Sequence, residues 1–402
     1  MSIHLLPISE ICEVTIKELF DNQVSESKYL DYKMKIDLDN PTEILKDVSS
    51  FANTFGGMII YGISEANGLP AEVCNVPGDA DQIIRSYESI IRTGLTPTII
   101  GVEMKFVKMT ETASVFIVKI PKSYNSPHMV IRSGQQRFYL RNSRSSDPMT
   151  HTEIKDSFQA YAILERQIDE FISERYSKIM SDSAGTKLME NKETIVLHVI
   201  PFASIRKDHY ISPRQLSEQR DNLVSFDDSG ITGRYNFNGY INIRRLNREE
   251  FPYPHAYTQL FRSGIIETVD KYLLDESYME QPRKMIPIVL LENEVIKLTE
   301  KYLTILNNLI ISPPTLIQLA LFGIEGYGIP TNHPYRGATP IQESFLILPE
   351  IVLHSYPQTK VEIENQLKPI FDALWNAAGY PGSLYYGEDG NRLNDQVPSL
   401  IY

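Results

Sequence analysis

Two neighbouring segments, ESKYLDYK at residues 26–33 and NPTEILKDVSSFANTFGGMIIYGISE at residues 40–65, decide the fold of the first third of the chain. The first segment alternates between two kinds of side chain, which is typical of a β-strand. Asp31 and Lys33 would lie on one face of this strand, with apolar and aromatic side chains on the other. We therefore expect a strand here, followed by a helix and a second strand.

The second segment carries signals for the start and the end of a helix. Asn40 is a suitable N-cap and Pro41 a suitable first helical residue, while Gly56 and Gly57 permit a left-handed helix end. One continuous apolar face is formed by Ile44, Leu45, Val48, Phe51, Ala52 and Phe55. The run at 58–63 is nearly all apolar, which predicts a central strand covered on both faces, with Glu65 emerging at its end.

The composition is that of an ordinary globular protein of two or three domains, with 402 residues, 42% hydrophobic and 22% charged. The two cysteines, Cys12 and Cys74, give no disulfide framework, so we expect a reducing, cytoplasmic setting. The N-terminus has no signal-peptide pattern, and no apolar run approaches the ~20 residues of a membrane helix. We therefore expect no membrane contact. The net charge of −12 argues against a protein that coats nucleic acid over its whole surface, but it permits a local basic groove.

The remaining pattern predicts an α+β (mixed α/β) protein with four parts. These are a lead-in helix within 1–22, a first domain over 23–150, a linker helix over 151–186, and a second α+β domain over 187–402. The polar stretch SDSAGTK at 181–187 is the best domain boundary. The second domain has no readable chemistry of its own.

Local periodicity predicts further elements. Helices are expected at 8–24 (with Ser9 as N-cap), 80–92, 151–180 and 359–378, and strands at 99–109, 113–121, 194–201, 235–245 and 257–261. Residues 265–272 mix strand and helix signals, and residues 286–309 are expected to open as a strand and continue as a helix.

A basic tract stands out in this acidic chain, because no Asp or Glu occurs between Thr112 and Ser146. The tract contains Lys119, Lys122, Arg132, Arg137, Arg141 and Arg144, with Phe138 and Tyr139 interleaved. Arginine pairs with phosphate oxygens in bidentate fashion, and aromatic rings stack on unpaired bases. We predict a nucleic-acid contact by Lys122, Arg132, Arg137, Tyr139, Arg141 and Arg144. The alternative is a solvated hairpin whose arginines pair with the protein's own acids.

Asp31-Tyr32-Lys33 has the acid-x-lysine form common to metal-dependent nucleases. A divalent cation held by carboxylates offsets the negative charge of phosphodiester cleavage and orients the nucleophile, and a lysine can stabilise the transition state. Mg²⁺ or Mn²⁺ prefers oxygen ligands. Glu26, Asp31 and Glu65 could share such an ion if their strands are neighbours. The alternative is an ordinary Asp31–Lys33 salt bridge, with Glu26 and Glu65 as surface charges.

Taken together, ESKYLDYK, the helix end SSFANTFGG, the strand MIIYGISE and the later segment RFYLRNSRSS resemble the Schlafen AlbA-like (AlbA_2) domain over residues 23 to about 150. The resemblance implies a metal-dependent endoribonuclease that cuts transfer RNA and ribosomal RNA with three acids. By position, Glu26, Asp31 and Glu65 match these acids and Lys33 the lysine, so the implied catalytic set is Glu26, Asp31, Lys33 and Glu65, with the three acids as ligands of Mg²⁺ or Mn²⁺. Asp31 stands where the family has Glu, and Glu65 where it has Asp. The resemblance also implies that Asn53 and the two glycines after it are structural.

Three functions remain open at this point. The first is a Schlafen-type endoribonuclease acting on structured RNA, with transfer RNA the expected target, in antiphage defence by analogy with prokaryotic relatives. The second is a DNA-binding or RNA-binding regulator without catalysis. The third is a sensor or assembly subunit, in which residues 187–402 recognise a protein or ligand trigger. The family's paired domains also make a homodimer an expectation.

Overall fold

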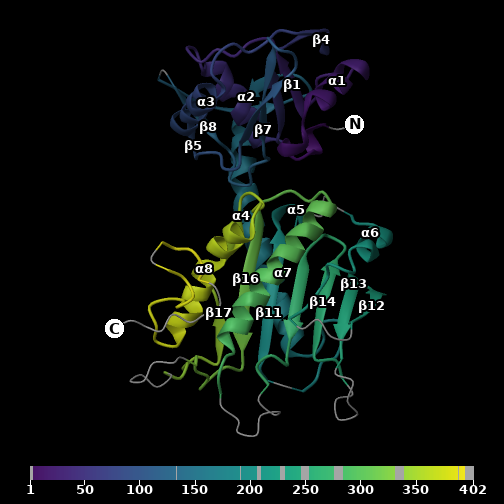
Figure 1. Ribbon diagram of the computed structural model, residues 1–402, viewed down its shortest axis with the longest axis vertical. Coiled ribbons are helices and arrows are strands. Elements are labelled where there is room, and N and C mark those ends of the chain that lie inside the picture. The colour runs from purple at the N-terminus through teal and green to yellow at the C-terminus, as the bar shows by residue number, and fades with distance from the viewer. Residues whose placement is uncertain are drawn as a thin grey trace. The chain divides into compact units, whose positions relative to one another are not determined.

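The computed structural model describes residues 3–132, 134–190, 192–205, 210–226, 231–245, 253–275, 284–330, 339–387 and 389–393. The chain divides into two compact units, Met1–Glu165 and Arg166–Tyr402 (Figure 1). Helix α4, His151–Met180, contributes residues to both units. Each unit combines helices with sheets, which confirms the predicted α+β class. None of the helices in the described part of the chain has both the length and the apolar character needed to cross a membrane.

The first unit is built on a four-stranded sheet in the order β1-β2-β7-β6. Its strands are β1 (Leu30–Lys33), β2 (Gly57–Tyr61), β7 (Ser114–Ile120) and β6 (Glu103–Lys108). Strands β1 and β2 run parallel and are connected by helix α2 (Thr42–Asn53), whereas the other neighbours are antiparallel. The structure confirms the predicted strand, helix and strand, although the N-cap of α2 is Pro41 instead of Asn40.

A second sheet and a hairpin complete this unit. The sheet has the order β10-β9-β8-β5, with strands β10 (Ser146–Pro148), β9 (Gln135–Arg141), β8 (Met129–Arg132) and β5 (Leu95–Thr96). Strands β3 (Ile63–Ala66) and β4 (Leu69–Val73) pair separately. The prediction of one strand over 58–63 is therefore wrong about where that strand ends. Strand β2 stops at Tyr61 because Gly62 adopts φ +89°, which turns the chain out of the central sheet.

Both faces of the central sheet are covered, as the apolar character of β2 predicts. Helices α2 and α3 (Ala80–Gly94) pack on one face, around Phe51 and Tyr87. Helix α1 (Glu13–Asp21) packs on the other face, where Leu30 and Tyr32 of β1 also point. The alternation predicted for β1 is thus confirmed, and its charged side chains face α2.

The lead-in segment forms its α-helix later than predicted. Two short 3-10 helices, η1 (Ile3–Leu5) and η2 (Ile8–Glu10), come first, and Cys12 instead of Ser9 is the N-cap of α1. The Lys105 ammonium on β6 accounts for the delay, because it binds the carbonyl oxygens of Ser9 and Ile11, each at 2.8 Å. These carbonyls are therefore engaged by a side chain and not by a helical backbone.

Asn53 ties the end of α2 to the second sheet. Its amide nitrogen donates to the carbonyl oxygens of His128 and Tyr139 at 3.1 and 2.9 Å, and its oxygen accepts from the His128 amide at 2.7 Å. Gly57 has φ +150°, and a Cβ there would lie 2.6 Å from the Tyr29 carbonyl oxygen. The structural role predicted for Asn53 and the glycines is confirmed.

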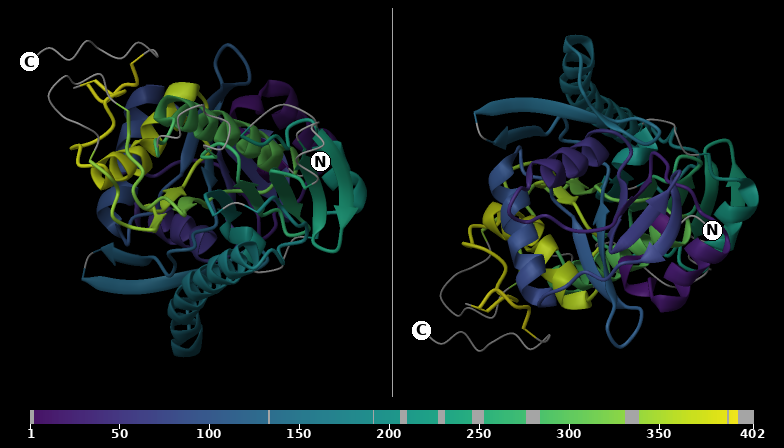
Figure 2. Two further views of the ribbon diagram at one scale, coloured as in Figure 1. Left: turned by 90° about the horizontal axis from the view of Figure 1, so that it is seen from below. Right: turned by 90° about the horizontal axis from the view of Figure 1, so that it is seen from above.

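The second unit is built on one antiparallel sheet in the order β12-β13-β14-β15-β11-β16-β17, with β18 also paired to β16. Its strands are β11 (Thr194–Pro201), β12 (Ile231–Asn236), β13 (Gly239–Arg244), β14 (Ala256–Phe261), β15 (Ile266–Asp270), β16 (Thr315–Phe322), β17 (Phe345–Ile347) and β18 (Ile351–Leu353). Helices α7 (Ile288–Asn308) and α8 (Lys360–Ala377) cover one face and the end of α4 the other, as Figure 2 shows. Two short helices, α5 (Phe202–Ile205) and α6 (Pro213–Glu218), follow β11.

Two mixed signals in this unit resolve into single elements. The helical part expected within 265–272 is absent from this described segment, which forms strand β15 instead. The strand expected at the start of 286–309 is wrong, because Ile288 already begins α7. Ile288 and Leu291 are buried, so this apolar run is the inner face of a helix, which a short run cannot distinguish from a strand.

A buried carboxylate links α4 to the sheet of the second unit. Glu267 on β15 accepts two hydrogen bonds from Arg175, at 2.8 and 2.7 Å, and lies 2.9 Å from His198 Nε2. Burial acts to raise the pKa of Glu267, but Arg175 and His198 outweigh it and lower that pKa to about 2. His198 lies within the buried strand β11, and this contact gives it a structural role.

Replacing Asn53 by alanine should destabilise the first unit selectively. The substitution leaves two carbonyl groups and one amide of the interior without their partner, so we expect a loss of at least ~2 kcal/mol. Native-state hydrogen exchange of the α2 and β9 amides measures this loss.

The matched control is Asn142→Ala, which removes an exposed side-chain contact with Asp147. Fluorescence of the single tryptophan, Trp375 in the second unit, should be unchanged in both variants. Equal protection of α2 in Asn53→Ala and in the control would contradict the role given to Asn53.

Candidate nucleic-acid interface

A buried set of charges joins β1, α2 and β9. Asp31 Oδ1 accepts from Arg141 Nη2 at 2.9 Å, and Asp31 Oδ2 lies 2.9 Å from Lys33 Nζ. Lys33 Nζ also lies 3.3 Å from Asp47 Oδ2. The side chains of Asp31 and Arg141 are 3% and 1% exposed, so this ion pair belongs to the interior. Burial acts to lower the pKa of Lys33, but Asp47 and Asp31 outweigh it and the pKa is raised.

Asp47 extends this set to β10. Its Oδ1 accepts from Ser146 Oγ at 2.9 Å, and that hydroxyl lies 2.8 Å from Ser50 Oγ. Burial raises the pKa of Asp47, which the Lys33 ammonium offsets in part. Sequence reasoning missed Asp47. The available signal was its spacing of three residues from Ile44, which places a charge next to the apolar face of α2.

The other two predicted acids are engaged by backbone groups. Glu26 precedes β1, and its Oε1 accepts from the Tyr32 amide at 3.0 Å. Burial raises the pKa of Glu26, and the Asp31 and Glu65 charges raise it further. Glu65 is exposed on the β3–β4 hairpin, and its Oε2 accepts from the Gly68 amide at 2.5 Å.

This arrangement does not fit the Mg²⁺ or Mn²⁺ ion expected at Glu26, Asp31 and Glu65. Both Asp31 oxygens already face cations, and Glu65 is bonded within a hairpin that lies outside the central sheet. In the described part of the chain, no group of three or more His, Cys, Asp or Glu side chains could hold a metal ion. For Asp31 and Lys33, the structure has the salt bridge that stood as the alternative.

The structure divides the predicted nucleic-acid-binding residues between interior and surface. Arg141 and Tyr139 are buried and are not part of the exposed surface, and their predicted contact with nucleic acid stays a prediction. Their position is explained by Asp31, which fixes Arg141, and by Asn53, which binds the Tyr139 carbonyl. Lys122 is half-buried, with its ammonium 5.6 Å from the centre of the Tyr124 ring.

Three arginines of the predicted set remain on the surface. Arg132 ends β8, Arg137 lies on β9, and Arg144 lies in the turn from β9 to β10, all of them exposed. None of the three pairs with a carboxylate in the part of the chain that the structure describes. Arg144 does donate to the Asn67 carbonyl oxygen, at 3.3 Å, which holds it against the β3–β4 turn.

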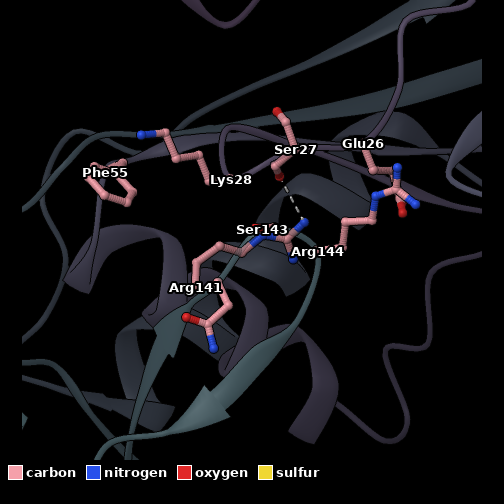
Figure 3. Close-up of a pocket in the computed structure, with 8 residues that line it drawn as sticks. Glu26, Ser27, Lys28, Phe55, Arg141, Ser143 and Arg144 are labelled. Carbon is pink, nitrogen blue, oxygen red and sulfur yellow. Dashed lines mark hydrogen bonds between the residues drawn. The ribbon is translucent and has the colours of Figure 1, made fainter.

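A pocket of about 550 Å³ opens between the segment before β1 and the β9–β10 turn (Figure 3). Its lining consists of Glu26, Ser27, Lys28, Phe55, Arg141, Asn142, Ser143 and Arg144. Three of these residues are cationic and one is acidic. Inside the first unit, this is where the predicted acid Glu26 and the basic tract meet.

Sequence reasoning missed the aromatic side of this pocket. Phe55 was expected on the apolar face of α2, but α2 ends at Asn53 and the Phe55 ring is 44% exposed. The Lys28 ammonium lies 4.1 Å from the centre of that ring. Tyr29 packs edge-on against Phe55, with ring centroids 5.8 Å apart, and His4 stacks on Tyr29 at 4.5 Å. The signal that could have identified Phe55 was its place directly before Gly56, because a helix that is stopped by this glycine can end before Phe55.

Comparison with known proteins identifies the class of the first unit. Residues 26–150 match the family model described as Schlafen, AlbA_2. This part of the chain is therefore an AlbA_2 domain of the Schlafen type, which confirms the resemblance read from the sequence. No curated protein matches the chain.

Two solved structures share local similarity with the chain. The DIP2311 protein from Corynebacterium diphtheriae has 15% identity and a TM-score of 0.27, over 37% of this chain and 28% of that protein. The N-terminal domain of a RecG-related protein from Nitrosomonas europaea has 21% identity and a TM-score of 0.26, over 33% of this chain and 94% of that domain. The chain thus spans less than a third of the Corynebacterium protein.

The Asp31–Arg141 pair should behave as a structural unit. Arg141→Met leaves a carboxylate in the interior without its main partner, so we expect the first unit to lose about 3–5 kcal/mol of stability. The double variant Asp31→Asn/Arg141→Met removes both charges and should recover most of that loss. Hydrogen exchange of the α2 amides in increasing urea measures both values. Equal stabilities of the single and the double variant would contradict this account.

Proposed function

We propose that the AlbA_2 domain binds nucleic acid through exposed basic side chains on β8, β9 and the β9–β10 turn. The observation that carries this proposal is that Arg132, Arg137 and Arg144 are exposed and have no carboxylate partner among the described residues, in a protein of net charge −12. The phosphate backbone of RNA or DNA supplies the regularly spaced negative charges that such side chains pair with. The AlbA_2 match at residues 26–150 supports the same conclusion.

The interior charges support a division of labour within the basic tract. Arg141 and Lys119 are engaged inside the protein, by Asp31 and by the Leu6 carbonyl oxygen respectively. Their role is to hold the fold. Among the described residues, Arg132, Arg137 and Arg144 have no ion pair with a carboxylate, so pairing with phosphate does not break one.

A second candidate function is Schlafen-type endoribonuclease activity on structured RNA such as transfer RNA. The observation that favours it is Glu26, which lines the pocket and whose pKa is raised by burial and by the nearby Asp31 and Glu65 charges. A raised pKa in a pocket is a mark of functional carboxylates. Against it stands the present engagement of Asp31 by Arg141 and Lys33.

Removing the exposed arginine charges should reduce the salt dependence of nucleic-acid binding. For Arg132→Gln/Arg137→Gln, two lost phosphate contacts lower the slope of log K against log salt by roughly 1.4–1.8. Fluorescence anisotropy with labelled RNA and DNA over a salt series measures the slope.

The matched control is Lys17→Gln/Lys108→Gln, which removes the same charge from α1 and β6, where both lysines pair with neighbouring glutamates. This control should keep the wild-type slope. The same slope in both double variants would exclude the proposed surface.

A cleavage assay separates the two candidate functions. Purified protein is incubated with mixed transfer RNA in Mg²⁺ or Mn²⁺, and the products are resolved by electrophoresis. Our first candidate predicts binding without cleavage. Cleavage that is abolished by Glu26→Gln and by Asp31→Asn, with folding retained, would establish the second candidate, whereas cleavage unaffected by both substitutions would indicate a contaminant.

A further inference from the structure

We propose that the pocket of Figure 3 receives one unpaired nucleotide, with its base stacked on Phe55 and its phosphate beside Arg141 and Arg144. This inference rests on the proposed nucleic-acid binding and goes beyond it, because it names the strandedness of the ligand and a site for it. Phosphate contacts on β8 and β9 alone would not distinguish paired from unpaired nucleic acid.

One side of the pocket is aromatic. Phe55 is a large exposed ring held in place by Tyr29, which is in turn stacked on His4. A ring fixed in this way provides a ready platform for a base, since every base has a face that can stack. A base inside a duplex has both faces covered by its neighbours and is not available for this contact.

Lys28 occupies the platform in the absence of a ligand. Its ammonium lies 4.1 Å from the centre of the Phe55 ring, and the side chain is exposed. An exposed cation–π contact is weaker than the stacking of a base on an aromatic ring. A base should therefore displace the ammonium, which is then free to pair with the adjoining phosphate. In Figure 3, Lys28 and Phe55 lie on the same side of the pocket.

The other side of the pocket is basic. Arg141 is buried and lines the pocket, yet its Nε has no hydrogen-bond partner. Nε is itself buried, and Asp31 binds Nη2, so a phosphate that reached Nε would leave the ion pair intact. Arg144 and the hydroxyl of Ser143 are exposed next to it, and a guanidinium pair with a hydroxyl is a common phosphate-binding set.

The charges around the pocket sum to a positive value. The residues that line the pocket carry three positive charges, on Lys28, Arg141 and Arg144, and one carboxyl group, on Glu26. Burial raises the pKa of Glu26, and the Asp31 and Glu65 charges raise it further. The pocket is thus suited to an anion that carries a flat ring.

The test compares single-stranded RNA of about 12 nucleotides with a duplex of the same sequence, by anisotropy on the full-length protein. Phe55→Leu keeps an apolar side chain but removes the ring, and should weaken single-strand binding about tenfold or more while leaving duplex binding unchanged. Phe55→Trp restores the ring and should restore the affinity. Circular dichroism checks the folding of each variant.

The outcomes separate this inference from the proposed function. If Phe55→Leu leaves single-strand affinity unchanged while Arg132→Gln/Arg137→Gln weakens it, the pocket assignment is overturned and the basic surface stands. If Phe55→Leu weakens single-strand and duplex binding equally, the ring does not select unpaired bases and the inference is again overturned. If the wild-type protein binds neither ligand, the proposed function fails and the pocket assignment fails with it.

Discussion

The ion pair between Asp31 and Arg141 is the interaction on which the first unit depends. It joins the first strand of the central sheet to the last residue of β9, across 110 positions of sequence, at 2.9 Å and with both side chains buried. Each charge would be costly in the interior alone, so the two are retained as a pair. Lys33 and Asp47 continue the pair into α2, and Ser146 continues it into β10. These contacts therefore connect the two sheets and α2 to one another at one point.

Because some charged side chains are used in the interior, only the others are exposed and available to bind nucleic acid. The basic tract contributes Arg141 to the ion pair and Lys119 to the N-terminal segment, and leaves Arg132, Arg137 and Arg144 at the surface. The acids divide in the same way. Asp31 stabilises the fold, whereas Glu26 lines the pocket next to Arg144. An acidic protein can therefore present a local basic surface, because the compensating carboxylates lie elsewhere.

The backbone of the first unit was largely predictable, because its signals are local. The alternation in β1, the apolar face of α2 and the glycines after it are each visible within a few residues, and all three are found in the structure. The site was less predictable, because it depends on contacts between distant segments. Nothing near Arg141 in the sequence indicates that Asp31 binds it, and nothing near Glu65 shows that Gly62 turns its strand away. Phe55 illustrates the same limit, since its helical spacing hid an exposed ring.

The central claim is that Asp31 is bound by Arg141 and Lys33 to stabilise the fold and is not a metal ligand. The most direct measurement is the crystal structure of the protein soaked in Mn²⁺, with anomalous scattering to locate the ion. We predict that the 2.9 Å contact between Asp31 and Arg141 is kept and that no manganese lies among Glu26, Asp31 and Glu65. A manganese ion bound to Asp31 and Glu26, with Arg141 moved away, would contradict the account.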